Sequence, residues 1–209
     1  QNQEAHMVVL SALGKTTNQL EKLTRALYHQ DREGFSSRLA EIRAYHFDLL
    51  EGLLPGDHPV YDVIGDIFAS LEQSFDAGWS DYDFIYDQVV SKGEILSTQM
   101  VSAYIRSRGI SCRYEDIRKY LITDRVFREA NIDWPATRQA VSGNLMPGSG
   151  EVILTQGFIG GTRDGKSTTL GREGSDYTAA ILANLFDAEQ LIIWKDVPGV
   201  LNADPRYFE

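Results

Sequence analysis

The sequence has little of what builds disulfide frameworks, metal centres or membrane spans. Cys112 is the one cysteine among 209 residues, which excludes an internal disulfide framework and is typical of a reducing compartment. No apolar run approaches the roughly 20 residues that a helical span needs, and no signal-peptide pattern opens the chain. We therefore expect a cytoplasmic protein that does not bind a membrane. We also expect Cys112 to be a buried structural thiol.

Histidine is equally sparse, and none of the four is spaced with Cys112 as zinc ligands are; they are His6, His29, His46 and His58. We expect no metal site built from side chains alone. Positively charged residues are also fewer than negatively charged ones, with 20 Lys and Arg against 30 Asp and Glu, which gives a formal net charge of -10. Such a field repels polyphosphate backbones, so a nucleic-acid partner is not expected. A small anionic ligand needs only a local positive pocket.

The first half of the chain has the apolar spacing of strands and helices. Met7–Ser11 is a short apolar run that predicts a buried strand, and Asn18 can cap a following helix through about Gln30. Three further helices are predicted by apolar residues at helical spacing, the last of them interrupted at Gly93; they cover about 39–53, 60–75 and 82–108. We interpret these apolar stripes as core.

The second half changes to short strands and glycine. Residues 151–155 predict a strand, a glycine-dense stretch runs from Gly157 to Gly174, a helix covers about 175–187, and residues 191–194 predict another strand. This order favours an α/β fold, a three-layer α/β/α sandwich with a mostly parallel central sheet. Such sheets bind ligands at the carboxyl ends of their strands.

Within the glycine-dense stretch, Gly160–Ser167 satisfies the pattern of a phosphate-binding P-loop. The context argues against it, because Ser167 is followed by two threonines and two glycines that form helix poorly. The Asp164-Gly165 pair instead predicts the tip of a β-hairpin.

A better anion site follows at Gly171-Arg172-Glu173-Gly174-Ser175-Asp176, which leads into an alanine-rich helix. Glycines let a ligand approach the backbone, free N–H groups at a helix start attract anions, and arginine suits a carboxylate or phosphate. The plainer alternative is that Ser175 and Asp176 only cap the helix. Three further segments suggest the same kind of site: 10–18, 91–94 and 194–206.

Together these segments, in this order, resemble the aspartokinases of the amino-acid-kinase family. The matching pieces are Val8–Ala12 with Thr17-Asn18, Ser91–Thr98, Thr155–Ile159, Leu170–Ala179 and Trp194–Arg206. The resemblance covers nearly the whole chain, 1–209, as one catalytic domain. It implies an aspartate-binding part at about 1–150 and a nucleotide-binding part at about 151–209, with the fold incomplete at both ends.

The resemblance implies ATP-dependent phosphorylation of the side-chain carboxylate of L-aspartate, with Mg²⁺, in lysine, threonine and methionine biosynthesis. Glu94 would pair with the α-ammonium of aspartate and Arg172 with its α-carboxylate. Ser11, Thr17 and Ser175 would complete the substrate site, and Asp176 would organise the catalytic groups. The nucleotide would meet Gly171, Gly174, Lys195, Asp196, Leu201 and Arg206. A homo-oligomer is expected for the full-length enzyme.

Three positions depart from the family pattern: Glu173 replaces a glycine, Lys195 a threonine and Leu201 a tyrosine. We expect Glu173 to point away from the phosphate path. The family's opening Lys-Phe-Gly-Gly strand, whose lysine contacts the transferring phosphate, and the regulatory domains do not occur in these residues, so we expect this chain by itself to be inactive or nearly so. The alternatives are another amino-acid kinase (glutamate, acetylglutamate, carbamate or UMP), a P-loop NTPase, or a catalytically dead nucleotide-binding chain.

Overall fold

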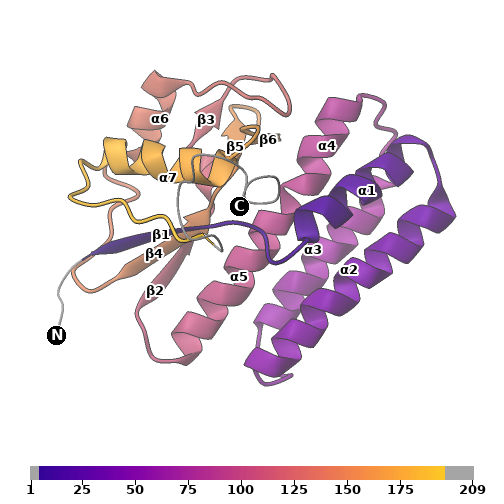
Figure 1. Ribbon diagram of the computed structural model, residues 1–209, viewed down its shortest axis with the longest axis horizontal. Helices are drawn as coiled ribbons and strands as arrows, with labels where there is room; N and C mark the ends of the chain where they lie inside the picture. Colours follow the sequence, from indigo (N-terminus) through magenta and orange to yellow (C-terminus); the bar gives the residue numbers. More distant parts are fainter. Residues whose placement is uncertain (1–4, 196–209) are drawn as a thin grey trace, which may run out of the picture.

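The computed structural model describes residues 5–195 (Figure 1). Five helices dominate the first half of the chain and pack side by side: α1 (Thr16–Tyr28), α2 (Arg32–Leu53), α3 (Val60–Ser74), α4 (Tyr82–Val90) and α5 (Lys92–Ser107). Side-chain caps begin two of them, since Asp31 accepts a hydrogen bond from the N–H of Gly34 and Asp81 accepts from Asp83 and Phe84.

The apolar stripes of these helices form a buried core, as their spacing predicted. Leu20, Ile64, Phe68 and Leu96 are all at most 1% exposed and belong to one cluster. Burying several large side chains of this kind stabilises the fold by about 1.5–3 kcal/mol each. The bundle is therefore a rigid support for residues that project from α1, α4 and α5.

The strands form two small sheets that are mostly parallel. The first has the order β1-β4-β2 and is wholly parallel, from β1 (His6–Leu10), β4 (Val152–Gln156) and β2 (Cys112–Glu115). The second has the order β3-β5-β6, in which β3 (Ile122–Thr123) is parallel and β6 (Ser167–Thr169) antiparallel to β5 (Ile159–Thr162). The antiparallel β5–β6 pair is the hairpin expected around Gly165, which has a φ of +80°.

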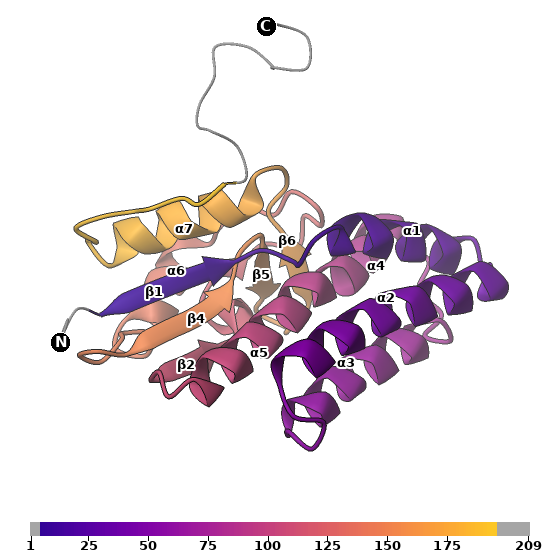
Figure 2. The same ribbon diagram turned by 60° about the horizontal axis from the view of Figure 1, so that its bottom comes forward.

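Helices cover both faces of the first sheet, which gives the expected layered α/β arrangement. In Figure 2, α7 (Gly174–Leu185) lies over one face and α5 lies over the other, with the remaining bundle beyond α5. The short helix α6 (Trp134–Val141) packs on β3. The carboxyl ends of β1 and β4 point toward the starts of α1 and α7, so the loops that follow them meet there.

Three local predictions were wrong. Asn18 is not a cap: α1 already begins at Thr16, whose N–H bonds to the Leu13 carbonyl across the turn at Gly14. The long helix breaks at Ser91 instead of Gly93, because Gly93 lies inside α5. No strand forms at 191–194, since this segment pairs with none of the described strands and is exposed, Trp194 to 90%. Among residues 5–195 no helix is long and apolar enough to cross a membrane.

Candidate active site

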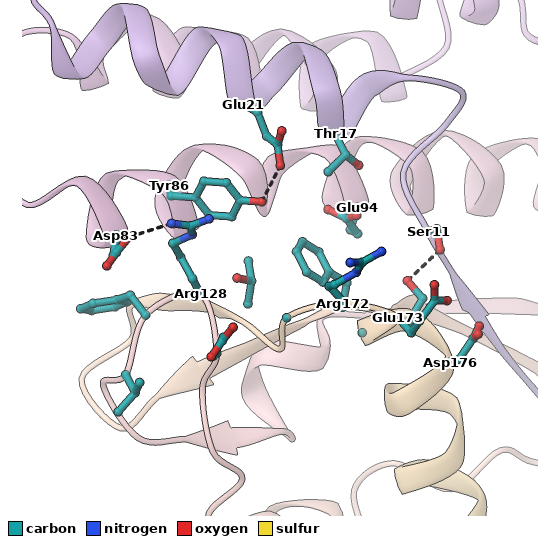
Figure 3. A pocket seen from close by; sticks show the side chains of 18 of the residues that line it. Ser11, Thr17, Glu21, Asp83, Tyr86, Glu94, Arg128, Arg172, Glu173 and Asp176 are labelled. Atoms are coloured by element: carbon teal, nitrogen blue, oxygen red, sulfur yellow. Dashed lines mark hydrogen bonds and ion pairs between the residues drawn. The ribbon is translucent and has the colours of Figure 1, made fainter.

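A cleft of about 690 Å³ lies where the helical bundle meets the start of α7. Nine of the predicted site residues line it: Ser11, Thr17, Glu94, Gly171, Arg172, Gly174, Ser175, Asp176 and Lys195. Figure 3 shows Glu94 and Arg172 facing the same space although they are far apart in the sequence. The structure thus brings together residues from both of the parts expected at 1–150 and 151–209. Asp196, Leu201 and Arg206 lie outside the described residues.

Glu94 is the most unusual group in the cleft. Its side chain is 2% exposed, and its Oε2 atom is buried without a hydrogen-bond partner in the described structure. Burial raises the pKa of this carboxyl to about 8, although the N–H groups of Ala12 and of Glu94 itself act in the opposite direction. Gly93 allows this burial, because a Cβ there would meet Ala12 and Leu20 at 3.1 Å. Such a carboxyl is suited to a cationic partner that is not part of the protein.

The start of α7 forms the opposite wall of the cleft. The Ser11 hydroxyl donates to the Ser175 hydroxyl at 2.7 Å, which joins the end of β1 to the first turn of α7. A Cβ on Gly157 would lie 2.7 Å from the Ser175 Cα, so only glycine lets β4 end this close to the helix. The free N–H groups of this helix start therefore open into the cleft beside Gly174.

Arg172 lies at the same wall, just before α7, and is exposed. Its guanidinium makes no ion pair or hydrogen bond within residues 5–195. An arginine free in this way can bind a carboxylate or phosphate in a bidentate manner without first breaking an internal contact.

Glu173, Asp176 and Lys195 form an ion-pair cluster on the α7 side. The Lys195 ammonium lies 2.7 Å from Asp176 and 3.0 Å from Glu173, and these carboxylates raise its pKa. Glu173 lines the cleft, so the expectation that it points away was wrong. Two of the three departures from the family pattern, Glu173 and Lys195, therefore contact each other. Glu173 also has a φ of +54°, a left-handed conformation that favours the glycine it replaces.

The cleft continues past Arg172 to residues that the sequence did not single out. Tyr86 donates a hydrogen bond to Glu21 at 2.8 Å, and the Arg128 guanidinium lies 4.6 Å from the centre of the Tyr86 ring and pairs with Asp83 (Figure 3). Phe158 lines the cleft with a φ of +69°. It lies in the Thr155–Ile159 motif, which could have drawn attention to it. Glu21 and Tyr86 carried no signal, because each looks like an ordinary residue of an amphipathic helix.

The model of the protein family described as "Amino acid kinase family" matches residues 1–209. The chain belongs to this family. Lysine-sensitive aspartokinase 3 of Escherichia coli (strain K12) is 36% identical over 206 residues, a match that covers 96% of this chain and 44% of that protein. A bifunctional aspartokinase/homoserine dehydrogenase 1, chloroplastic, of Arabidopsis thaliana is 33% identical, covering 97% of this chain and 23% of its own length.

Solved aspartokinase structures have the same fold as this amino acid kinase chain. The crystal structure of E. coli aspartokinase III in complex with aspartate and ADP superimposes with a TM-score of 0.82 at 34% identity, over 96% of this chain and 44% of that one. The complex of the same enzyme with lysine and aspartate gives a TM-score of 0.84. The resemblance to aspartokinases and the expected α/β fold are confirmed. The chain spans less than half the length of these relatives.

The P-loop interpretation does not fit this member of the family. Lys166 lies at the hairpin turn and Ser167 begins strand β6, so neither residue opens a helix. A P-loop binds phosphate through the N–H groups of the helix that its lysine and serine begin. Within the described range no three His, Cys, Asp or Glu side chains cluster as metal ligands.

Proposed function

We propose that this chain is part of an aspartate kinase and carries the site that binds L-aspartate for phosphorylation on its side-chain carboxylate. One observation carries the proposal: a buried carboxyl without a partner, Glu94, and a free guanidinium, Arg172, face one cleft at the start of a helix. These two groups complement the ammonium and the carboxylate of an α-amino acid. The names of the relatives support aspartate as that amino acid.

Aspartate would bind with its α-ammonium on Glu94 and its α-carboxylate on Arg172. The hydroxyls of Ser11, Thr17 and Ser175 line the same cleft and would accept or donate the remaining hydrogen bonds. Because the α-ammonium and the α-carboxylate are both bound, the side-chain carboxylate is free to point toward the phosphate donor. Holding two reactants in this way can lower the barrier by about 7–11 kcal/mol at most.

The chemistry needs little proton transfer, because a free carboxylate is ionised near pH 7. A side-chain oxygen of aspartate would attack the γ-phosphorus of ATP, the bond from that phosphorus to the β,γ-bridging oxygen would break, and 4-phospho-L-aspartate and ADP would form. The protein's task is to align the two anions and to offset their charge. The N–H groups at the start of α7, with Gly171 and Gly174 beside them, would serve that purpose.

Asp176 and Lys195 would organise the phosphate side of the site. Their 2.7 Å ion pair fixes a cation within the cleft, where it can contact a phosphate oxygen. We assign nucleotide contacts to Lys195, and the same role stays a prediction for Asp196, Leu201 and Arg206. Mg²⁺ would be held by the nucleotide phosphates, and Asp176, which lines the cleft, could supply a carboxylate oxygen. When bound, it would offset phosphate charge.

The proposal is tested with the full-length gene product that contains these residues, in a coupled assay for ADP. Acceptors are compared side by side: aspartate, glutamate, N-acetylglutamate, carbamate and UMP. We expect ADP formation that depends on aspartate, and turnover with one of the others instead would assign the chain to that activity. ADP binding without turnover of any acceptor would indicate a nucleotide-binding protein without activity.

Two substitutions separate the proposed site from a P-loop. Asp176→Ala should reduce kcat by at least about 100-fold, as the loss of a charge-organising group does. Lys166→Ala, at the exposed hairpin turn, should change kcat by less than about twofold. The opposite ranking would support a P-loop NTPase. Cytoplasmic location, a homo-oligomer and a place in lysine, threonine and methionine biosynthesis stay predictions for the full-length protein.

A further inference from the structure

Asp87 is a buried carboxylate in α4 that does not line the cleft. It is 0% exposed and accepts three hydrogen bonds from two distant segments. Its Oδ2 accepts from the backbone N–H of Arg128 and of Thr169, each at 2.9 Å, and its Oδ1 accepts from the Thr169 hydroxyl at 2.7 Å. One side chain thus joins a helix to the end of strand β6 and to the loop at Arg128, both far from it in the sequence.

Both of these segments are walls of the cleft. Thr169 lines it and precedes Arg172 by only three residues, and Arg128 lines its far end. The two walls also contact each other, because the N–H of Ala130 bonds to the Thr169 carbonyl at 3.0 Å and Glu129 bridges Leu170. Asp87 therefore attaches both walls to the helical bundle, and other α4 side chains add to this: Gln88 makes two hydrogen bonds with the backbone of Ser167, and Asp83 pairs with Arg128.

A buried carboxylate with this environment is not explained by an ion pair. The Arg128 guanidinium pairs with Asp83, and Asp87 receives only the Arg128 backbone N–H. Burial raises the pKa of Asp87 to about 6, against the opposing effects of its hydrogen bonds and of the nearby Arg128 charge. A group that costs folding energy in this way and fixes loop geometry is typical of a residue retained for positioning.

We propose that Asp87 is a positioning residue for the amino-acid site: it holds the Thr169–Arg172 wall and the Arg128 loop against α4, so that Arg172 is in place before substrate binds. This inference rests on the proposed function. The three-residue link limits how far Arg172 can move while Thr169 is fixed. Without the anchor, ordering of this wall would accompany substrate binding, and the affinity for the amino acid would fall.

The first test measures steady-state kinetics of the full-length gene product. Asp87→Ala should raise the KM for aspartate at least about tenfold and change the KM for ATP by less than about threefold, since a lost anchor near Arg172 costs binding of the amino acid. Asp87→Asn should rescue most of the loss, because its amide oxygen can accept from both N–H groups and its NH2 can donate to Thr169.

The control is Thr137→Val. Thr137 is also 0% exposed and also fastens a helix to a distant backbone N–H, that of Ile122 at 3.0 Å, but it does not line the cleft. It should lower the melting temperature without moving either KM. An equal rise of the aspartate KM in Thr137→Val, or none in Asp87→Ala, would overturn the proposal. If Asp87→Ala does not fold, Thr169→Val removes one of the bonds, and an unchanged aspartate KM would overturn it.

A second test does not depend on catalysis. Amide hydrogen exchange at Arg128, Ala130 and Thr169, whose N–H groups are hydrogen-bonded at this anchor, should be at least about tenfold faster in Asp87→Ala than in the wild type, and unchanged in Thr137→Val. Unchanged exchange at these amides would exclude the anchor. The wild type could fail to phosphorylate aspartate while exchange in Asp87→Ala still accelerates as expected. The proposed function would then be wrong, but the attachment of the cleft walls by Asp87 would be supported.

Discussion

At the scale of single residues, the environment of a side chain matters more than its type. Glu94 is an acidic residue at the start of a helix, where a carboxylate is ordinarily solvated and ionised. In the fold its side chain is only 2% exposed, and burial raises its pKa to about 8, which favours the protonated form at neutral pH. A cation that binds in the cleft beside Glu94 favours the ionised carboxylate, so its binding displaces the proton of Glu94.

We predict that aspartate binding at pH 7 releases about one proton, because the α-ammonium stabilises the ionised form of Glu94 and lowers its pKa. Isothermal titration calorimetry in buffers of different ionisation enthalpy measures this number directly. The release should vanish near pH 9, where Glu94 is already ionised in the free protein. Equal proton release at both pH values would contradict the assignment.

The same pKa sets a dependence of stability on pH. The carboxyl of Glu94 ionises near 4.5 in the unfolded chain and near 8 in the fold, so the folded state holds the extra proton between those values. The free energy of unfolding should therefore fall as pH rises through this window. Glu94→Gln should remove this part of the pH dependence, as denaturant unfolding at pH 5 and pH 9 would show.

Glu173 offers a second prediction at this scale. Its left-handed backbone costs a residue with a Cβ about 1–2 kcal/mol, whereas its exposed ion pair with Lys195 contributes about 0–1 kcal/mol. Glu173→Gly should therefore raise the stability by about 1 kcal/mol, measured by thermal or urea unfolding. Glu173→Gln is the control, since it loses the charge and keeps the strain; it should not be stabilised.

At the scale of elements, the site depends on how closely neighbouring elements approach. The end of β4 and the first turn of α7 meet at Gly157 and Ser175, with room for no Cβ. The sequence predicted β4, α7 and the hairpin between them. It did not show whether Gly157 is needed for a turn or for a close contact. Only the packed structure shows that it serves a close contact.

We predict that Gly157→Ala displaces the start of α7 and lowers the stability by about 1–3 kcal/mol, because backbone atoms of Ser175 must move. Its affinity for aspartate should fall as well, measured by calorimetry. Gly65→Ala in α3 is a matched control, with nothing within 4 Å of the added Cβ, and should stabilise the protein by about 0.5–1 kcal/mol. Equal effects of the two substitutions would contradict the close-contact explanation.

At the scale of the whole molecule, the cleft lies between two hydrophobic cores. One core fills the helical bundle and the other joins the sheets to α7, and Phe158 and Ile67 pack against both. Glu94 projects from a helix between the cores, and Arg172 from the wall before α7. A ligand held by both residues links the two halves of the molecule, so it should stabilise the molecule as a unit.

We predict that aspartate at about 100 times its Kd stabilises the protein by about 2.7 kcal/mol, a rise of roughly 5–10 °C in Tm for a chain of this size. Differential scanning fluorimetry measures the shift. Succinate, which lacks the ammonium, should give a much smaller shift, and Arg172→Ala should abolish the response to aspartate. If succinate raised the Tm as much as aspartate does, Glu94 would not be the group that binds the ammonium.

The sequence by itself determined the fold class, the apolar stripes of α2, α3 and α5 and the Gly165 hairpin, because these depend on local periodicity and turn chemistry. Through the family motifs it also predicted roles for Glu94 and Arg172, which line one cleft in the structure. Tertiary structure decided what depends on distant contacts: the burial of Glu94, the ion pairs of Lys195 and the three hydrogen bonds of Asp87. Residues 191–194 illustrate the same limit, since an apolar run becomes a strand only where another strand accepts its hydrogen bonds.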